Sequence, residues 1–126
     1  MIYMGDSLTR VGRYKQRFNE LLDLNIDEYD IMVSDYGLRT HMVNRGHADC
    51  LQYVDCLPEI INHPTYIGIN PNENGTSFEL IKDFGDNILV GIKLDTNNSY
   101  FYVSTIYKVQ QSKINRRLNS GRIKSF

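Results

Sequence analysis

Two histidines and an arginine lie close together in the segment His-Met-Val-Asn-Arg-Gly-His, residues 41–47. On a helix, His41 and Arg45 are four residues apart and share one face, and Gly46 allows the chain to turn His47 toward the same place. Imidazoles accept and donate protons near neutral pH, and a guanidinium binds an anion through two parallel hydrogen bonds. This set therefore suits phosphoryl transfer. A packed helix end with an exposed arginine and a histidine in a turn would produce the same pattern without any chemistry.

The histidine segment does not match a standard metal centre. His41, His47, Asp49 and Cys50 are neighbours in the sequence, but their spacing fits no HExxH motif and no zinc-finger array. The patterns GxxxxGK[ST], GxGxxG after a strand and GxSxG are also absent, which argues against nucleoside triphosphate, dinucleotide and α/β-hydrolase chemistry. We therefore expect no metal ion and no cofactor.

The charge of the chain is divided between its two ends. Over 126 residues, 14 Lys and Arg stand against 15 Asp and Glu, a formal net charge of −1. Residues 96–126 contain six basic residues and no Asp or Glu, whereas residues 1–95 carry a net charge of −7. A basic end can attract a polyanion locally even when the whole molecule is nearly neutral. A solvated basic helix at the end of the chain is the alternative interpretation.

Hydrophobic periodicity predicts helices in the first half of the chain and strands in the second. Ser34 and Asp35 form a typical helix start, and Asn74-Gly75 is a strong hairpin signal. The expected helices cover residues 14–24, 35–45, 48–54, 57–61 and 110–118, and the expected strands cover residues 66–69, 76–84, 88–94 and 99–107, with a short extended piece at 31–33.

This order of elements predicts an α+β fold. N-terminal helices should pack on one face of a four-stranded antiparallel sheet, and a short basic helix should follow at the C-terminal end. The length fits a single domain over residues 1–126. No segment is apolar over the length needed to cross a membrane, and the N-terminus lacks the apolar stretch of a signal peptide, so we expect a cytoplasmic protein.

Strand alternation predicts which side chains lie on the sheet face that the helices leave open. If Leu80, Val90 and Phe101 face the helices, the open face carries Glu79, Lys93, Tyr102 and Ser104. Lys82 and Thr105 then fall on the covered side, unless a β-bulge turns one of them to the other face. A shift of one residue would exchange the two sets.

Several segments taken together resemble the phage and mobile-element branch of the barnase–EndoU–colicin–RelE-like nucleases. The resemblance extends over about residues 30–126 and is carried by the ordered set of His41–His47, Leu57–Gly68, Ser77–Lys82, Ile88–Lys93 and Tyr102–Tyr107. It implies helices against a four-stranded antiparallel sheet, with RNA cut on the open side. The implied activity is that of a metal-independent, toxin-like endoribonuclease, in which the ribose 2′-OH attacks phosphorus to leave a 2′,3′-cyclic phosphate and a 5′-OH.

The resemblance also implies roles for individual residues. The histidine segment would supply proton transfer and anion binding, and a lysine on a middle strand, Lys82 or Lys93, would stabilise the phosphorane. Strand alternation favours Lys93 of these two and Ser104 over Thr105, whereas the family pattern favours Thr105, which we follow. The catalytic residues expected are His41, Arg45, His47, Lys93 and Thr105, and the substrate-binding residues are Lys82, Ser104, Tyr107, Lys113, Arg116 and Arg122.

The expected partners follow from this activity. The substrate would be RNA, with tRNA as one candidate, and the basic C-terminal helix would bind the flanking phosphates irrespective of sequence. A small toxic nuclease would also need an antitoxin or immunity protein. The alternative is a non-catalytic RNA-binding or phage-associated interaction module of the same fold, which would bind RNA without cutting it.

Overall fold

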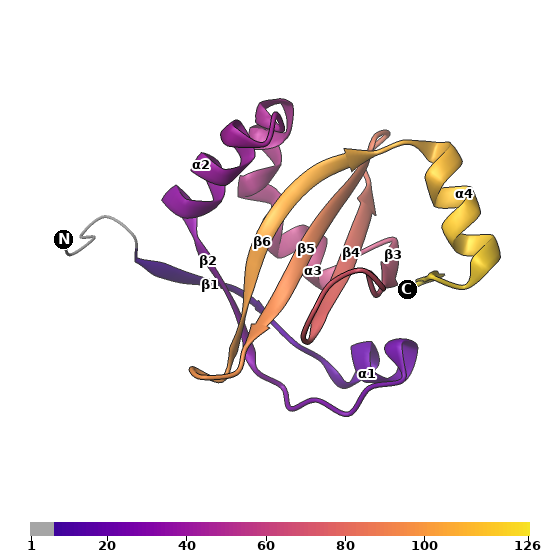
Figure 1. Ribbon diagram of the computed structural model, residues 1–126, viewed down its shortest axis with the longest axis horizontal. Helices are drawn as coiled ribbons and strands as arrows, with labels where there is room; N and C mark the ends of the chain where they lie inside the picture. Colours follow the sequence, from indigo (N-terminus) through magenta and orange to yellow (C-terminus); the bar gives the residue numbers. More distant parts are fainter. Residues whose placement is uncertain (1–6) are drawn as a thin grey trace.

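A twisted sheet forms the centre of the computed structural model, which describes residues 7–126 (Figure 1). Within these residues the sheet has seven strands in the order β1-β2-β6-β5-β4-β3-β7. The elements, in chain order, are β1 (Leu8–Arg13), α1 (Gln16–Leu22), β2 (Asp30–Ser34), α2 (Asp35–Asn44), the 3₁₀ helix η1 (Ala48–Cys56), α3 (Leu57–Asn62), β3 (Tyr66–Gly68), β4 (Ser77–Asp83), β5 (Asn87–Asp95), β6 (Tyr100–Val109), α4 (Gln111–Ser120) and β7 (Ile123–Ser125).

The α+β class is confirmed, but the prediction of a sheet with only four antiparallel strands is wrong. The expected meander is present as the antiparallel neighbours β3, β4, β5 and β6. Strand β2 adds to it in parallel with β6, β1 extends this side, and β7 pairs with β3 at the opposite edge. These additions are short or polar strands, and β2 pairs with a strand about 70 residues away, so local periodicity gives no signal for the pairing.

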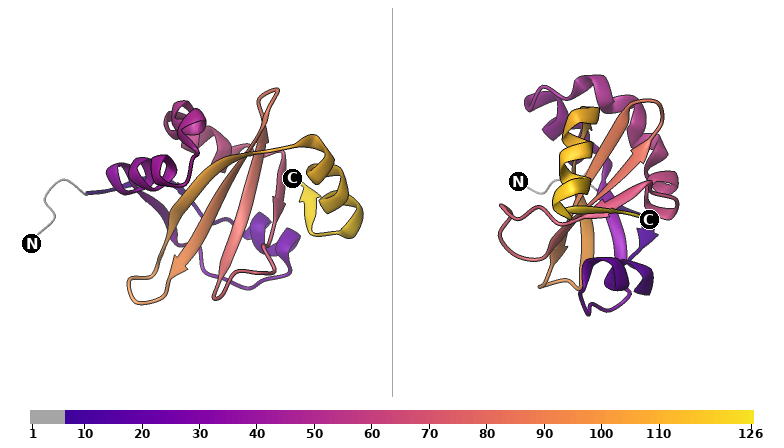
Figure 2. Two further views of the ribbon diagram at one scale, coloured as in Figure 1. Left: turned by 45° about the horizontal axis from the view of Figure 1, so that its top comes forward. Right: turned by 90° about the vertical axis from the view of Figure 1, so that its right-hand side faces the viewer.

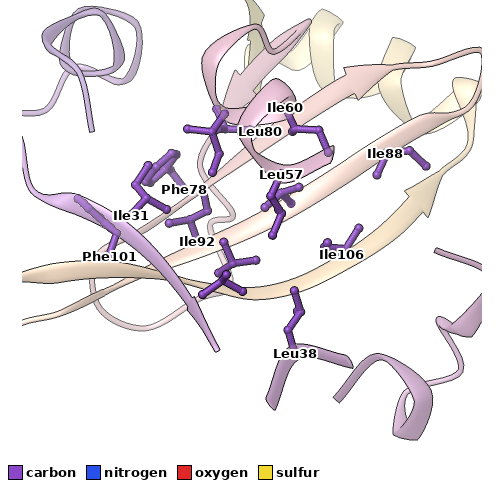
Figure 3. Packing of buried hydrophobic residues seen from close by; sticks show 14 of the residues in the cluster. Ile31, Leu38, Leu57, Ile60, Phe78, Leu80, Ile88, Ile92, Phe101 and Ile106 are labelled. Atoms are coloured by element: carbon purple, nitrogen blue, oxygen red, sulfur yellow. The ribbon is translucent and has the colours of Figure 1, made fainter. Parts of the chain in front are cut away.

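One face of the sheet packs against α1, α2, η1 and α3 through alternate strand residues (Figure 3). The predicted core positions Leu80, Val90 and Phe101 are all at most 1% exposed. Alternation in each strand and the apolar sides of the helices thus build one continuous core. Its other large members include Ile31, Leu38, Leu57, Ile60, Phe78, Ile88, Ile92 and Ile106.

The second face is partly covered, which corrects the prediction that it stays open. Helix α4, at the β7 end of the molecule, packs with β7 onto this face (Figure 2). The helix ends at Gly121, whose φ of 80° is the left-handed conformation that favours glycine. This reversal returns the chain to pair as β7. The resulting second core consists of Ile81, Leu89, Val109, Ile114 and Ile123, with Tyr66, Tyr107 and Leu118 beside it.

The helices predicted in the first half of the chain are confirmed in part. The Ser34 side chain accepts a hydrogen bond from the Gly37 backbone N–H at 3.1 Å and begins α2, as its position predicts. Residues 48–56 form a 3₁₀ helix rather than an α-helix, and the predicted helix over residues 14–24 is shortened to Gln16–Leu22. In the described part of the chain, no helix has the length and apolar character needed to cross a membrane.

Tyr14, in the aromatic part of the core, makes the free energy of unfolding depend on pH in the alkaline range. Its ring is fully buried against Phe18, Phe78 and Phe101, and its hydroxyl donates to Asn19 Oδ1 at 2.7 Å. Burial disfavours the phenolate and raises the pKa of Tyr14 to about 12. The folded protein therefore keeps this proton above pH 10, where the unfolded chain loses it, so the free energy of unfolding falls as pH rises from about 10 to 12.

Tyr14→Phe should reduce this alkaline loss of stability by at most about 2–3 kcal/mol, the value of a two-unit pKa shift. At pH 8 the variant should be only slightly less stable, because Asn19 Oδ1 keeps the backbone N–H of Ile26 as a donor. Urea unfolding at pH 8, 10 and 11 measures the effect, with Tyr53→Phe as the control. Equal pH dependence in the Tyr14 variant and the unsubstituted protein would contradict this prediction.

Candidate active site

The histidine segment packs beside the part of β6 that does not pair with β2. Within residues 7–126, strand β2 pairs with β6 only at Phe101 and Tyr102, and no other described strand pairs with the rest of β6 on that side. Helix α2 packs beside this edge instead (Figure 1), and so does η1. The turn between these two helices carries His47. The His47 ring stacks on that of Tyr107, with centroids 5.4 Å apart and planes at 25°. An imidazole is thereby held at the edge of the second face.

His41 lies farther along the same edge. It is half-buried and lines a groove of about 480 Å³ together with Leu38, Tyr102 and Ser104. Arg45, one turn later, ends α2 with its backbone N–H donating to the His41 carbonyl at 3.0 Å, and its side chain is exposed. The two histidines thus lie along the same edge of β6, and Arg45 lies in the turn between them.

A β-bulge in β6 turns two hydroxyl side chains to the second face. Gly91 of β5 pairs with Thr105 and Ile92 pairs with Val103, which leaves Ser104 as the extra residue. The Ser104 hydroxyl donates to the Gly91 carbonyl at 3.1 Å. A Cβ on Gly91 would lie 3.0 Å from the Thr105 methyl group, so the missing side chain makes room for the bulge. Ser104 and Thr105 both border the same cleft, so their positions do not decide which of the two is the site residue.

This cleft runs across the middle of the second face. It has a volume of about 80 Å³, and Lys93 supplies its cation. The Lys93 ammonium lies 3.3 Å from a carboxylate oxygen of Glu73, in the loop between β3 and β4 that forms one wall. An incoming phosphate would therefore compete with Glu73 for Lys93. The other residues around the cleft are Asn70, Ser77, Phe78, Glu79, Gly91, Ile92, Ser104, Thr105 and Tyr107.

Glu79 lines the cleft and belongs to a partly buried ion pair. The Glu79 side chain is 6% exposed and accepts a hydrogen bond from Arg122 Nη2 at 3.3 Å. Glu79 belongs to the predicted open face but is absent from the predicted site, because its partner is 43 residues away. Burial raises the pKa of Tyr107, and the Glu79 charge adds to this, while Arg117 and Arg122 act in the opposite direction. The Tyr107 hydroxyl therefore keeps its proton at neutral pH and can donate a hydrogen bond.

Other predicted site residues lie outside the cleft. Lys82 lies on the helix-covered side of β4, as strand alternation predicts, and its ammonium donates to the His63 carbonyl at 2.6 Å. Lys113 and Arg116 project from α4 and line a separate hollow with Arg117 and Arg122. Sequence reasoning missed Arg117, although it belongs to the basic segment after Asp95. Among residues 7–126, no three His, Cys, Asp or Glu side chains are grouped in a way that could hold a metal ion.

Comparison with known proteins identifies the family. Residues 9–116 match the family model described as phage-Barnase-EndoU-ColicinE5/D-RelE like nuclease 3, and this match includes His41, His47 and every strand of the meander. The chain matches no curated protein and no solved structure. The matched segment covers most of the chain, and the resemblance inferred from the sequence is confirmed. The chain therefore belongs to the phage-Barnase-EndoU-ColicinE5/D-RelE like nuclease 3 family.

Proposed function

We propose that this nuclease is an endoribonuclease that cuts RNA with its own side chains, without a metal ion. The observation that carries the proposal is the stacking of His47 on Tyr107, at the wall of a cleft that holds Lys93, Ser104 and Thr105. A proton-transfer group, a cation and several hydroxyls at one place are what phosphodiester transfer requires. We propose RNA as the substrate because these groups can transfer protons and stabilise charge, and the ribose 2′-OH of RNA can then act as the nucleophile.

The proposed reaction is a transesterification. The 2′-oxygen forms a bond to the adjacent phosphorus while the bond from phosphorus to the 5′-oxygen breaks, which gives a 2′,3′-cyclic phosphate and a 5′-OH. One of the two histidines accepts the proton of the 2′-OH, and the other donates a proton to the leaving 5′-oxygen. Lys93, released from Glu73, and Arg45 offset the negative charge that develops on the phosphate.

The hydroxyl groups of the cleft orient the phosphate in this proposal. Thr105 and the protonated Tyr107 donate hydrogen bonds to its oxygens, and Ser104 lies beside them on the bulge. Because Ser104 borders both the cleft and the groove that contains His41, a phosphate bound over the bulge would lie next to that groove, and Tyr107, on which His47 stacks, also lines the cleft. This arrangement supports the division of proton transfer between His41 and His47.

Cleavage of matched oligonucleotides tests the proposal. We expect RNA to be cut in a buffer containing EDTA, and the same sequence with 2′-deoxyribose at every position to remain intact, because it lacks the nucleophile. Binding of RNA without turnover would instead indicate the non-catalytic interaction module. Cutting that EDTA abolishes, or equal cutting of DNA, would contradict the mechanism.

We further propose that the protein acts as a toxin in the bacterial cytoplasm and that an antitoxin or immunity protein restrains it. The phage connection in the family description supports a role in conflict between mobile elements and their hosts. Expression in bacteria should arrest growth, and His47→Ala should relieve the arrest. tRNA remains one candidate substrate, and sequencing the 5′-OH ends in arrested cells would identify which RNA is cut.

A further inference from the structure

A second hollow lies next to the cleft, at the junction of α4 and β7. It has a volume of about 310 Å³ and is lined by Lys113, Arg116, Arg117, Ser120 and Arg122. Four of these five residues are cationic, and the fifth carries a hydroxyl. Glu79 is an acidic neighbour of this group, and its carboxylate is paired with Arg122. Four cationic side chains with one carboxylate beside them give the hollow a net positive charge, which favours the binding of an anion.

Two hydrogen-bond donors in this group lack an acceptor. Within the described residues, Arg117 Nη1 and Arg122 Nε are buried and have no hydrogen-bond partner. Buried donors are almost always satisfied in folded proteins, and leaving one unpaired is costly. A tetrahedral oxyanion bound between the two guanidinium groups would supply acceptors and negative charge together.

The hollow and the cleft have no lining residue in common, but interactions between their residues link them. Arg117 acts electrostatically on Tyr107, which lines the cleft, and Arg122 donates a hydrogen bond to Glu79, which also lines the cleft. Arg117 also borders a further hollow of about 290 Å³ with Tyr107, Lys108 and Lys113. A strand with a regular series of phosphates could therefore place one phosphate in the cleft and another at Arg117.

We propose that Arg117, with Arg122 and Lys113, binds a second phosphate of the RNA, distinct from the phosphate that is cut. This inference rests on the proposed function and defines a discrete subsite for it. The subsite recognises the backbone rather than a base, because four cationic side chains in one hollow match the charge of a phosphate. Its role is to fix the position of the strand relative to the histidines, so substrates without a phosphate at this position should bind more weakly.

Binding of short 2′-deoxy trinucleotides tests the subsite independently of cleavage, because these ligands have no 2′-OH to react. Three ligands are compared by calorimetry: one without a terminal phosphate, one with a 5′-phosphate and one with a 3′-phosphate. We expect one of the two terminal phosphates to strengthen binding about tenfold, and Arg117→Gln to remove that gain. Arg117→Lys, which keeps the charge but not the paired donors, should retain only part of it.

A matched variant and a competitor define the controls. Arg13→Gln removes the same charge from an exposed arginine on β1 and should keep the full gain. Inorganic phosphate should compete with the phosphorylated trinucleotide only weakly. The proposal is overturned if neither terminal phosphate strengthens binding, if the gain persists in a folded Arg117→Gln variant, or if inorganic phosphate binds as tightly as the phosphorylated trinucleotide. Thermal unfolding of each variant verifies that it is folded.

Discussion

His47→Ala should lower the rate of RNA cleavage by about 10²–10⁴-fold, the range expected when a proton-transfer group is lost. Its imidazole stacks on Tyr107 at the edge of the cleft, and alanine can neither accept nor donate the proton. The effect should fall on kcat rather than on KM, because His47 acts on the reacting atoms in the proposed mechanism. Single-turnover cleavage of a labelled oligoribonucleotide measures it.

Two controls separate chemistry from structure. His63→Ala removes an exposed imidazole at the end of α3 and leaves the His63 carbonyl that accepts the Lys82 hydrogen bond, so cleavage should be unchanged. Tyr107→Phe keeps a ring for His47 to stack on but loses the hydroxyl, and should reduce cleavage less than His47→Ala. A His47→Ala variant that cleaves at the original rate would show that His47 has no catalytic role.

Gly68→Ala should lower the free energy of unfolding by about 2–4 kcal/mol, because it detaches β7 from β3. Gly68 pairs with Ile123, and a Cβ at this position would collide with the Arg122 carbonyl and lie 2.7 Å from Ile123 Cγ2. The clash involves backbone and cannot be relieved by rotating a side chain. Detachment of β7 would bring Ile123, now only 1% exposed, into contact with solvent. It would also move Arg122 away from Glu79.

The activity of this variant distinguishes a local effect from a general loss of stability. Gly85→Ala serves as the control, because Gly85 has a φ of 99° in the β4–β5 turn and no atom within 4 Å of an added Cβ. It should lose stability through backbone strain alone and keep its cleavage rate when folded. Gly68→Ala should lose cleavage even when folded. Full stability in Gly68→Ala would contradict the close packing of β7 on β3.

The sequence alone predicts those parts of the fold that depend on local signals. Strand alternation places Leu80 and Phe101 in the core, and the Ser34 cap begins α2 where expected. The same alternation places Lys82 on the covered side and allows Thr105 to reach the second face only through a bulge, which the structure contains at Ser104. The free edge of β6 was not predictable, since it depends on where β2 stops pairing.

The parts of the site that depend on distant segments could not be predicted. Glu79 and Arg122 are 43 residues apart, and they meet only because α4 and β7 fold back onto the second face. The three-residue strand β7 is too short for periodicity to identify. The split in charge after Asp95 did indicate a basic end, but not that Arg117 would lie beside Tyr107 with a buried donor unpaired.

The chemical identity of the cut ends tests the central claim most directly. A short RNA containing a single 2′-deoxyribose at the mapped cleavage position is incubated with the nuclease in EDTA, beside the unmodified RNA, and the products are analysed by mass spectrometry. We predict that the unmodified RNA yields a 2′,3′-cyclic phosphate and a 5′-OH, and that the modified RNA is not cut at that position. A 5′-phosphate and 3′-OH, or cleavage at the 2′-deoxy position, would contradict attack by the ribose 2′-OH.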